Sequence, residues 1–293
     1  MRFKGIFVIV LLALLCVPAT QSSADTFSLV KTIDLYPVIG NSNNHEVDVV
    51  GNELYVQNWE LNRYFRINPV NSKLLGSFAL TNGSNVILMD NHGSDYNPTT
   101  GTIYHVSDDD HGAYPFYDAF FETDTAGNLV RGPYDLFGPG DNSEDPEGLA
   151  VDPFTGRVWV SMWGSEGIFR INPDDGTMIN NIFAGAATEL AFNPITGKLF
   201  FGGSGVIWQI ATDGTGLEMV FTPGTGIDGM AFTPTGDLAL VSGYQLLLYD
   251  GSYDHDDKFT TSSPVPEPAT MLLLASGLVG LAGLRRRLRK KEG

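Results

Sequence analysis

Five segments of the chain share one pattern, and each begins with a residue that can contribute to a binding site. Their sequences are EVDVVGNELYVQNW, HGSDYNPTTGTIYHVS, EGLAVDPFTGRVWVSMW, TELAFNPITGKLFFGG and DGMAFTPTGDLALVSG, which begin at Glu46, His92, Glu147, Thr188 and Asp228. Carboxylate oxygens with a histidine and neighbouring oxygens can hold a divalent cation, most simply Ca²⁺. If the segments meet, Glu46, Glu147 and Asp228 are candidate metal ligands in a polar ring. The alternative, which we favour, is that the five residues only begin strands beside solvent. The sequence assigns no catalytic residue.

Short repeated strands are the elements that would bring this ring together. Four segments carry a proline at the same place (Pro98, Pro153, Pro194 and Pro234), and the last three prolines are about forty residues apart, the length of one four-stranded propeller blade. In each unit an apolar strand leads into a turn set by Pro and Gly, and three further strands follow. The pattern predicts an all-β fold, a β-propeller of four-stranded antiparallel blades. We expect inner strands near 46–50, 93–97, 147–151, 188–192 and 228–232.

The repeats favour five blades. The second repeat is longer, with an insertion after Ser107 and before Glu147, so a sixth, degenerate blade hidden there is the alternative. The fifth repeat has no fourth strand after YQLLLYD, whereas TFSLVKTIDLY near the N-terminus has no repeat of its own. We expect this N-terminal strand to complete the last blade, because ring closure removes open sheet edges. Most tryptophans should lie in the blade cores, while Trp163 and Tyr244 end strands and are candidates for exposure.

The N-terminus has the features of a secretory signal. A basic start is followed by the apolar run GIFVIVLLALLCVP and by the small residues Ser22 and Ala24, which predict a signal peptide over 1–24. An N-terminal membrane anchor is the alternative. The single cysteine, Cys16, lies inside this segment, so the mature chain would have no disulfide and no thiol nucleophile. The propeller is expected over 25–253 and a polar linker over 254–264.

The C-terminal residues 265–293 differ in composition from the rest of the chain. Residues 269–284 contain no charged side chain, and six basic residues follow them. The apolar run predicts a helix detached from the propeller, slightly short for a full membrane span, with its basic end on the cytoplasmic side. A single-pass anchor is one interpretation of this tail.

A second interpretation comes from the order of its parts. Pro266, Glu267 and Pro268, then the apolar segment, then the arginine-rich end resemble the PEP-CTERM sorting signal of Gram-negative bacteria. The resemblance implies that an exosortase, a membrane processing enzyme, recognises this motif while the protein resides transiently in the inner membrane. It also implies release to the cell surface or to extracellular polysaccharide. We favour this interpretation over the anchor.

The charge of the chain limits its partners. The formal net charge is −17, and between Asp25 and Ser263 there are 9 basic and 32 acidic residues. A nucleic-acid partner is excluded, because phosphate contacts need clustered lysine and arginine. The chain has no P-loop, HExxH motif, nucleophile elbow or dinucleotide fingerprint. The acidic runs at 108–110 and 254–257 lack the spacing of an EF-hand loop and are interpreted as solvated loops.

Two functions fit these observations. The sequence favours a binding or scaffold module exported to the cell surface or the extracellular matrix, with surface proteins or polysaccharide, as in a biofilm, as partners. The stretch DPEGLAVDP also resembles the inner-strand motif of calcium-dependent propellers of the SMP-30/gluconolactonase and phytase-like groups. That resemblance implies a ligand role for Glu147 and the alternative function, a calcium-dependent hydrolase or lactonase.

Overall fold

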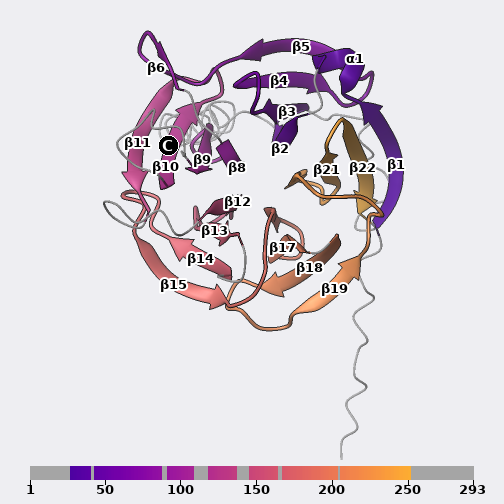
Figure 1. Ribbon diagram of the computed structural model, residues 1–293. Helices are drawn as coiled ribbons and strands as arrows, with labels where there is room; N and C mark the ends of the chain where they lie inside the picture. The colour runs from indigo at the N-terminus through magenta and orange to yellow at the C-terminus, as the bar shows by residue number, and fades with distance from the viewer. Residues whose placement is uncertain are drawn as a thin grey trace, which may run out of the picture.

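Five four-stranded antiparallel sheets stand around a central axis and form a β-propeller (Figure 1). The computed structural model describes residues 27–40, 43–87, 91–108, 118–136, 145–163, 167–203 and 205–251. The predicted signal peptide 1–24, linker 254–264 and tail 265–293 lie outside these residues, as do Asp109, Asp110 and the acidic run 254–257, so they stay predictions at the level of structure.

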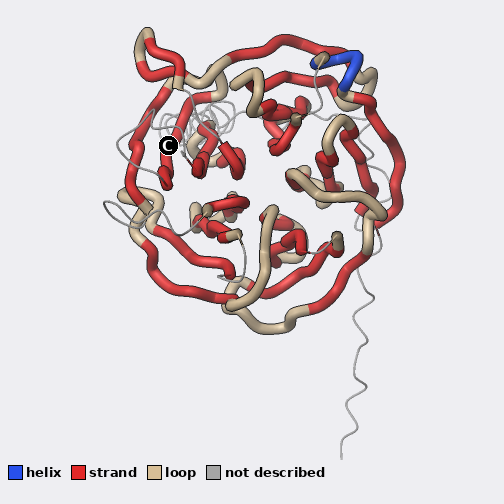
Figure 2. The backbone as a smooth tube through the Cα atoms, in the orientation of Figure 1, coloured by secondary structure: helices blue, strands red, loops and turns tan. Residues whose placement is uncertain are grey.

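Each blade runs from an inner strand at the axis to an outer strand at the rim (Figure 2). The five-blade count is therefore confirmed and the six-blade alternative is wrong. In chain order, blade 1 is β2 (Asn44–Val50), β3 (Glu53–Asn58), β4 (Arg63–Asn68) and β5 (Lys73–Phe78); blade 2 is β8 (Asn91–Asn97), β9 (Thr102–Asp108), β10 (Asp118–Asp124) and β11 (Leu129–Asp135); blade 3 is β12 (Pro146–Val151), β13 (Val158–Met162), β14 (Gly167–Ile171) and β15 (Met178–Phe183); blade 4 is β16 (Leu190–Asn193), β17 (Lys198–Gly203), β18 (Val206–Ala211) and β19 (Glu218–Phe221); blade 5 is β20 (Gly229–Phe232), β21 (Leu238–Ser242), β22 (Gln245–Gly251) and β1 (Phe27–Asp34).

The long second repeat holds ordinary strands. β10 and β11 lie between Ser107 and Glu147, where the sequence suggested an insertion, and they form the outer half of blade 2. Two small elements were not expected from the sequence. They are the hairpin β6 (Thr81–Asn82) with β7 (Asn85–Val86) between blades 1 and 2, and the single helical turn α1 (Tyr36–Ile39) after β1.

The N-terminal strand closes the ring, as predicted. β1 pairs antiparallel with β22, from Phe27 opposite Gly251 to Asp34 opposite Gln245. Ile33 is 2% exposed and packs with core residues of blades 1 and 5, such as Val47 and Leu246. The outermost strand of the last blade is thus supplied by the start of the chain, so the first and last repeats are held together by hydrogen bonds and by apolar packing.

The hydrophobic core lies between blades rather than within one layer. Each of the five core clusters joins two neighbouring blades, and β13 is buried along its whole length. A strand covered on both faces needs apolar residues in succession, which explains the unbroken run VWVSM. The outer strands, such as β5 and β15, are largely exposed.

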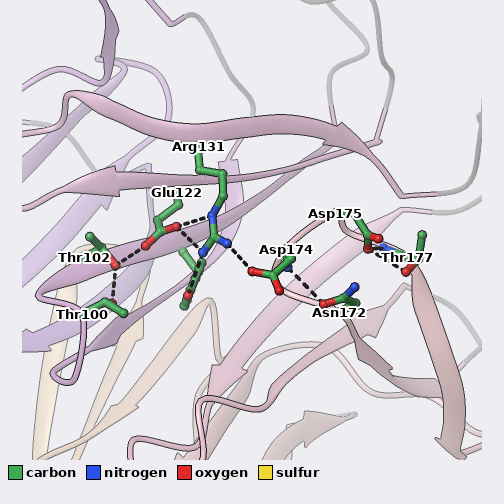
Figure 3. Close-up of polar contacts among 9 residues, drawn as sticks. Thr100, Thr102, Glu122, Arg131, Asn172, Asp174, Asp175 and Thr177 are labelled. Atoms are coloured by element: carbon green, nitrogen blue, oxygen red, sulfur yellow. Dashed lines mark hydrogen bonds and ion pairs between the residues drawn. The ribbon is translucent and has the colours of Figure 1, made fainter.

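Polar contacts also cross the blade interfaces, as two examples show. In the interface of blades 1 and 2, His105 is fully buried, with Nδ1 3.2 Å from the Tyr64 hydroxyl and Nε2 2.8 Å from the Thr123 hydroxyl. Between blades 2 and 3, Arg131 donates to Glu122 at 2.8 Å and to Asp174 at 2.6 Å, so the guanidinium lies between two carboxylates (Figure 3). These contacts fix how neighbouring blades are oriented.

Ring closure by Ile33 is testable by side-chain truncation. Ile33→Ala should lower the free energy of unfolding by about 2–4 kcal/mol, because it leaves a cavity in a closed interface. Leu29→Ala in the same strand should change it by less than about 0.5 kcal/mol, because Leu29 is 53% exposed. Urea unfolding followed by circular dichroism measures both. Equal effects of the two substitutions would mean that β1 contributes no interior packing.

The buried histidine predicts an acid-sensitive fold. Burial lowers the pKa of His105 from 6.5 to about 3, so folding is favoured while the ring is neutral and this contribution is lost as the pH falls from 6.5 towards 3. The free energy of unfolding should drop by up to about 1.4 kcal/mol per pH unit in that window. His105→Gln should be less stable than the wild type at pH 7, and the difference should shrink at pH 4. Urea unfolding at both pH values that gave an unchanged difference would contradict this assignment.

Candidate ligand-binding site at the start of the inner strands

The propeller has two ends that differ in chemistry. We call the end where the inner strands begin the start face; it carries His45, His92, Glu147, Thr188 and Asp228. The opposite end, where each inner strand passes into its first turn, is called the turn face. All five residues that the sequence singled out lie within two positions of the first residue of an inner strand and therefore near the start face. Their convergence follows from the ring of blades.

β-bulges shape the start face in three consecutive blades. The ladder between the first two strands shifts between Asn44 and Glu46 in blade 1, between Asn91 and Gly93 in blade 2, and between Pro146 and Gly148 in blade 3. The extra residue in each bulge is His45, His92 or Glu147. Because a bulge redirects a side chain relative to the strand, these three residues occupy equivalent positions around the axis.

The three bulge residues form a continuous row. The rings of His45 and His92 meet edge to face with centroids 5.8 Å apart, and His92 Nδ1 is 3.4 Å from Glu147 Oε2. The side chains of His92 and Glu147 are each 18% exposed. The sequence alignment placed Glu46 in this ring, whereas the structure places His45 there and Glu46 one residue further along β2.

Glu46 belongs to a second, buried set of acids along the inner strands. Its Oε1 accepts a hydrogen bond from the Val47 N–H at 2.8 Å, and burial followed by repulsion from Asp48 raises its pKa well above the usual value. Asp48 is fully buried, accepts a hydrogen bond from the Ser94 hydroxyl at 2.8 Å, and has a pKa raised by burial to about 7. Asp48 therefore carries a bound proton in part of the molecules near neutral pH.

Asp95 extends this set into blade 3. Its Oδ2 accepts a hydrogen bond from the Val151 N–H at 2.7 Å, and burial raises its pKa well above the usual value, with repulsion from Asp48 as the second cause. Asp48 and Asp95 each reach from one blade to the inner strand of the next. The sequence analysis missed both residues, although an aspartate inside an apolar inner strand, as in EVDVV, is a usable signal.

Glu189 is the acid that the sequence missed beside Thr188. It is 5% exposed, and its Oε2 has no hydrogen-bond partner among the described residues. Burial raises its pKa well above the usual value, and Glu46, Glu147 and Asp228 raise it further by electrostatic repulsion. Carboxyl groups from blades 1, 3, 4 and 5 thus lie close enough to interact at one place.

Thr188 and Asp228 are held in local hydrogen bonds. The Thr188 hydroxyl donates to the Gly202 carbonyl at 3.1 Å, and its own carbonyl accepts from the Ser161 hydroxyl. Asp228 Oδ2 accepts from the Gly243 N–H at 2.5 Å. Of the five residues predicted to form a ring, Glu147 and His92 contact each other directly, whereas Thr188 is directed into its own blade.

The close approach of inner strands explains two glycines at this face. A Cβ added to Gly148 would lie 2.5 Å from the Leu190 nitrogen, and one added to Gly229 would lie 2.6 Å from the Glu46 Cα. Both distances are shorter than any side chain tolerates, so backbone packs against backbone between blades. This packing brings side chains of neighbouring blades together at the axis.

Exposed aromatic residues lie on the same face as the acids. The backbone N–H of Trp59 donates to Asn43, and that of Trp163 donates to Asp145, which places both rings beside the start of an inner strand. Trp59 is 37% exposed, Trp163 60%, and Tyr244, in the turn after β21, 51%. The expected exposure of Trp163 and Tyr244 is confirmed. Trp159 is buried as expected and Trp208 is partly buried, but Trp59 lies on the surface, 6.0 Å from the His45 ring.

Three of the described cations are engaged at the opposite end. Arg66 pairs with Glu53 at 2.7 Å where β3 begins, and Arg131 pairs with Glu122 and Asp174 (Figure 3). Lys31 donates to the Pro69 and Val70 carbonyls in the turn between β4 and β5. All three sites are at the turn face. Repulsion among the carboxyls of the start face is therefore not offset by the cations of these pairs.

The carboxyls do not form a ready metal site. Among the described residues, no group of three or more histidine, aspartate or glutamate side chains is arranged to hold a metal ion. Glu46 is turned to a backbone N–H and Asp228 caps a turn, so their oxygens are partly committed. The calcium ligand set Glu46, Glu147 and Asp228 therefore stays a prediction.

Family comparisons agree with two features of the sequence. The chain carries a PEP-CTERM protein-sorting motif at residues 264–287 and an SMP-30/Gluconolactonase/LRE-like region at residues 93–203. The sorting-motif prediction is confirmed, and it supports export of the protein with processing by an exosortase. The second region covers less than half of the chain. No curated protein matches the sequence. Within the described part of the chain, no helix has the length and apolar character that a membrane crossing requires.

Solved structures share the fold at low sequence identity. Glutaminyl cyclase from Myxococcus xanthus is similar with a TM-score of 0.56 and 11% identity, over 78% of this chain and 97% of that one. A putative gluconolactonase gives a TM-score of 0.52 and 14% identity over 78% and 93%. A gluconolactonase from Xanthomonas campestris gives 0.50 and 11% over 78% and 96%. At these identities the likeness extends to the fold alone.

Proposed function

We propose that the protein is an exported binding module whose start face holds a ligand outside the cell. The observation that carries this proposal is the combination of carboxyls from four blades with three exposed aromatic rings on one face. Aromatic rings and convergent polar groups are typical of binding sites.

The sorting motif accounts for how the protein would reach the outside of the cell. An exosortase in the inner membrane of a Gram-negative bacterium would recognise Pro266, Glu267 and Pro268 and release the propeller to the cell surface or the medium. The acidic surface suits such an environment, because strong net charge keeps a protein soluble. Extracellular polysaccharide and surface proteins are the partners that this location offers.

A single experiment in cells separates delivery from binding. Replacing Pro266, Glu267 and Pro268 by alanine should leave the protein unprocessed in the membrane fraction. Trp163→Ala should be processed normally but should lose most of its retention on extracellular material, measured by immunoblotting of cell, matrix and medium fractions. Phe154→Ala is the matched control, because Phe154 is 76% exposed on the turn face, and it should behave as the wild type. Normal processing of the first variant would refute the sorting role, and normal retention of Trp163→Ala would refute binding at this face.

A calcium-dependent hydrolase or lactonase is the second candidate. The SMP-30/Gluconolactonase/LRE-like region, which includes Glu147, favours it, whereas the arrangement of donors does not. Bound Ca²⁺ would stabilise the fold by about 2–4 kcal/mol at 100–1,000 times its dissociation constant. If this candidate is right, millimolar Ca²⁺ raises the melting temperature, a chelator lowers it, and Glu147→Gln abolishes the response while Asp109→Asn does not. A melting temperature that ignores Ca²⁺ removes this candidate and leaves the binding module.

A further inference from the structure

The start face gathers carboxyl groups around an acceptor that lacks a donor. Glu189 is 5% exposed, its Oε2 has no partner among the described residues, and it interacts with Glu46, Glu147 and Asp228. A buried acceptor without a hydrogen bond costs free energy, and so does ionising a buried carboxyl that has no cation beside it. A cationic donor placed here would relieve both.

A row of aromatic rings leads to one of these acids. Trp59, His45 and His92 follow one another with ring centroids 6.0 Å and 5.8 Å apart, and His92 then contacts Glu147. This row leads from the exposed indole of blade 1 to a carboxylate of blade 3. The face of an indole attracts cations, most strongly when water is displaced.

The two observations together favour an organic cation over a metal ion. A metal needs several oxygen ligands held around one point, and the described residues contain no such group. An ammonium group needs only hydrogen-bond acceptors at about 2.8 Å and tolerates an aromatic neighbour. We propose that the start face binds its ligand through a primary ammonium group, which donates to Glu189 among the carboxyls to which the Trp59–His45–His92 row leads. This inference rests on the proposed function, because it specifies the ligand of the same face.

Two sources can supply a primary ammonium group outside a cell. One is an amino sugar with a free amine in a polysaccharide, whose ring could also stack on Trp59 or Trp163. The other is a free polyamine. The chemistry at Glu189 is the same for both, so the probes of the experiment distinguish them.

The experiment is titration calorimetry on the full chain purified in detergent, at pH 7 and low salt. The probes are a β-1,4-linked glucosamine tetramer, its fully N-acetylated counterpart and spermidine. We expect the glucosamine tetramer, spermidine or both to bind and the acetylated tetramer to bind at least about tenfold more weakly, because acetylation removes the charge. Glu189→Gln should weaken ammonium binding by roughly tenfold, and Trp59→Ala by roughly two- to fivefold.

The control removes the same charge elsewhere. Glu53 lies on the turn face beside Arg66, so Glu53→Gln should leave the affinity for the ammonium probes unchanged. A loss of affinity equal to that of Glu189→Gln would mean unspecific attraction to an acidic protein and would overturn the proposal. Equal binding of the acetylated tetramer, or no binding of either ammonium probe, would also overturn it. Trp59 is at the surface, so Trp59→Ala tests the proposal even if Glu189→Gln fails to fold. Retention of the Trp163→Ala protein in cells decides the proposed function separately, since it does not depend on the charge of the ligand.

Discussion

Every blade of this propeller depends on having a neighbour on each side. Each core cluster joins two blades, so a blade at an open end would expose half of its apolar surface. Pairing of β1 with β22 removes that open end and links residues more than two hundred positions apart in the chain. Because burial is shared around the whole ring, closure contributes to the stability of all five blades and not only to that of blade 5.

Closure of the ring also brings the inner strands of neighbouring blades into close contact, and the candidate site is formed by this contact. Gly148 and Gly229 let the backbones of neighbouring inner strands touch, which brings the carboxyls of different blades within reach of one another. Asp48 and Asp95 each use one oxygen for a hydrogen bond to the next blade, although Asp48 Oδ1 has no partner among the described residues. Glu189 keeps one oxygen unused among the described residues. Some carboxyls of the start face therefore stabilise the fold through hydrogen bonds, whereas Glu189 has an oxygen without a donor in the described part of the chain. This unpaired oxygen is the feature that suits a ligand.

The distribution of cations completes the contrast between the two faces. Arg66, Arg131 and Lys31 are bound on the turn face, where they connect strands and blades. The start face is left acidic and carries exposed tryptophans.

The sequence alone was enough to establish the repeat, the five blades, the closing N-terminal strand and the sorting motif, because each leaves a local pattern of apolar residues, turns or charge. It also placed Glu147 and His92 correctly at the start of inner strands. It could not find the equivalence of His45 with these residues, since a β-bulge adds one residue without changing the apolar pattern. Nor could it show that Glu189 faces carboxyls of three other blades, or that Asp48 and Asp95 are buried. These features depend on contacts between strands far apart in the chain, and only the closed ring decides which of them meet.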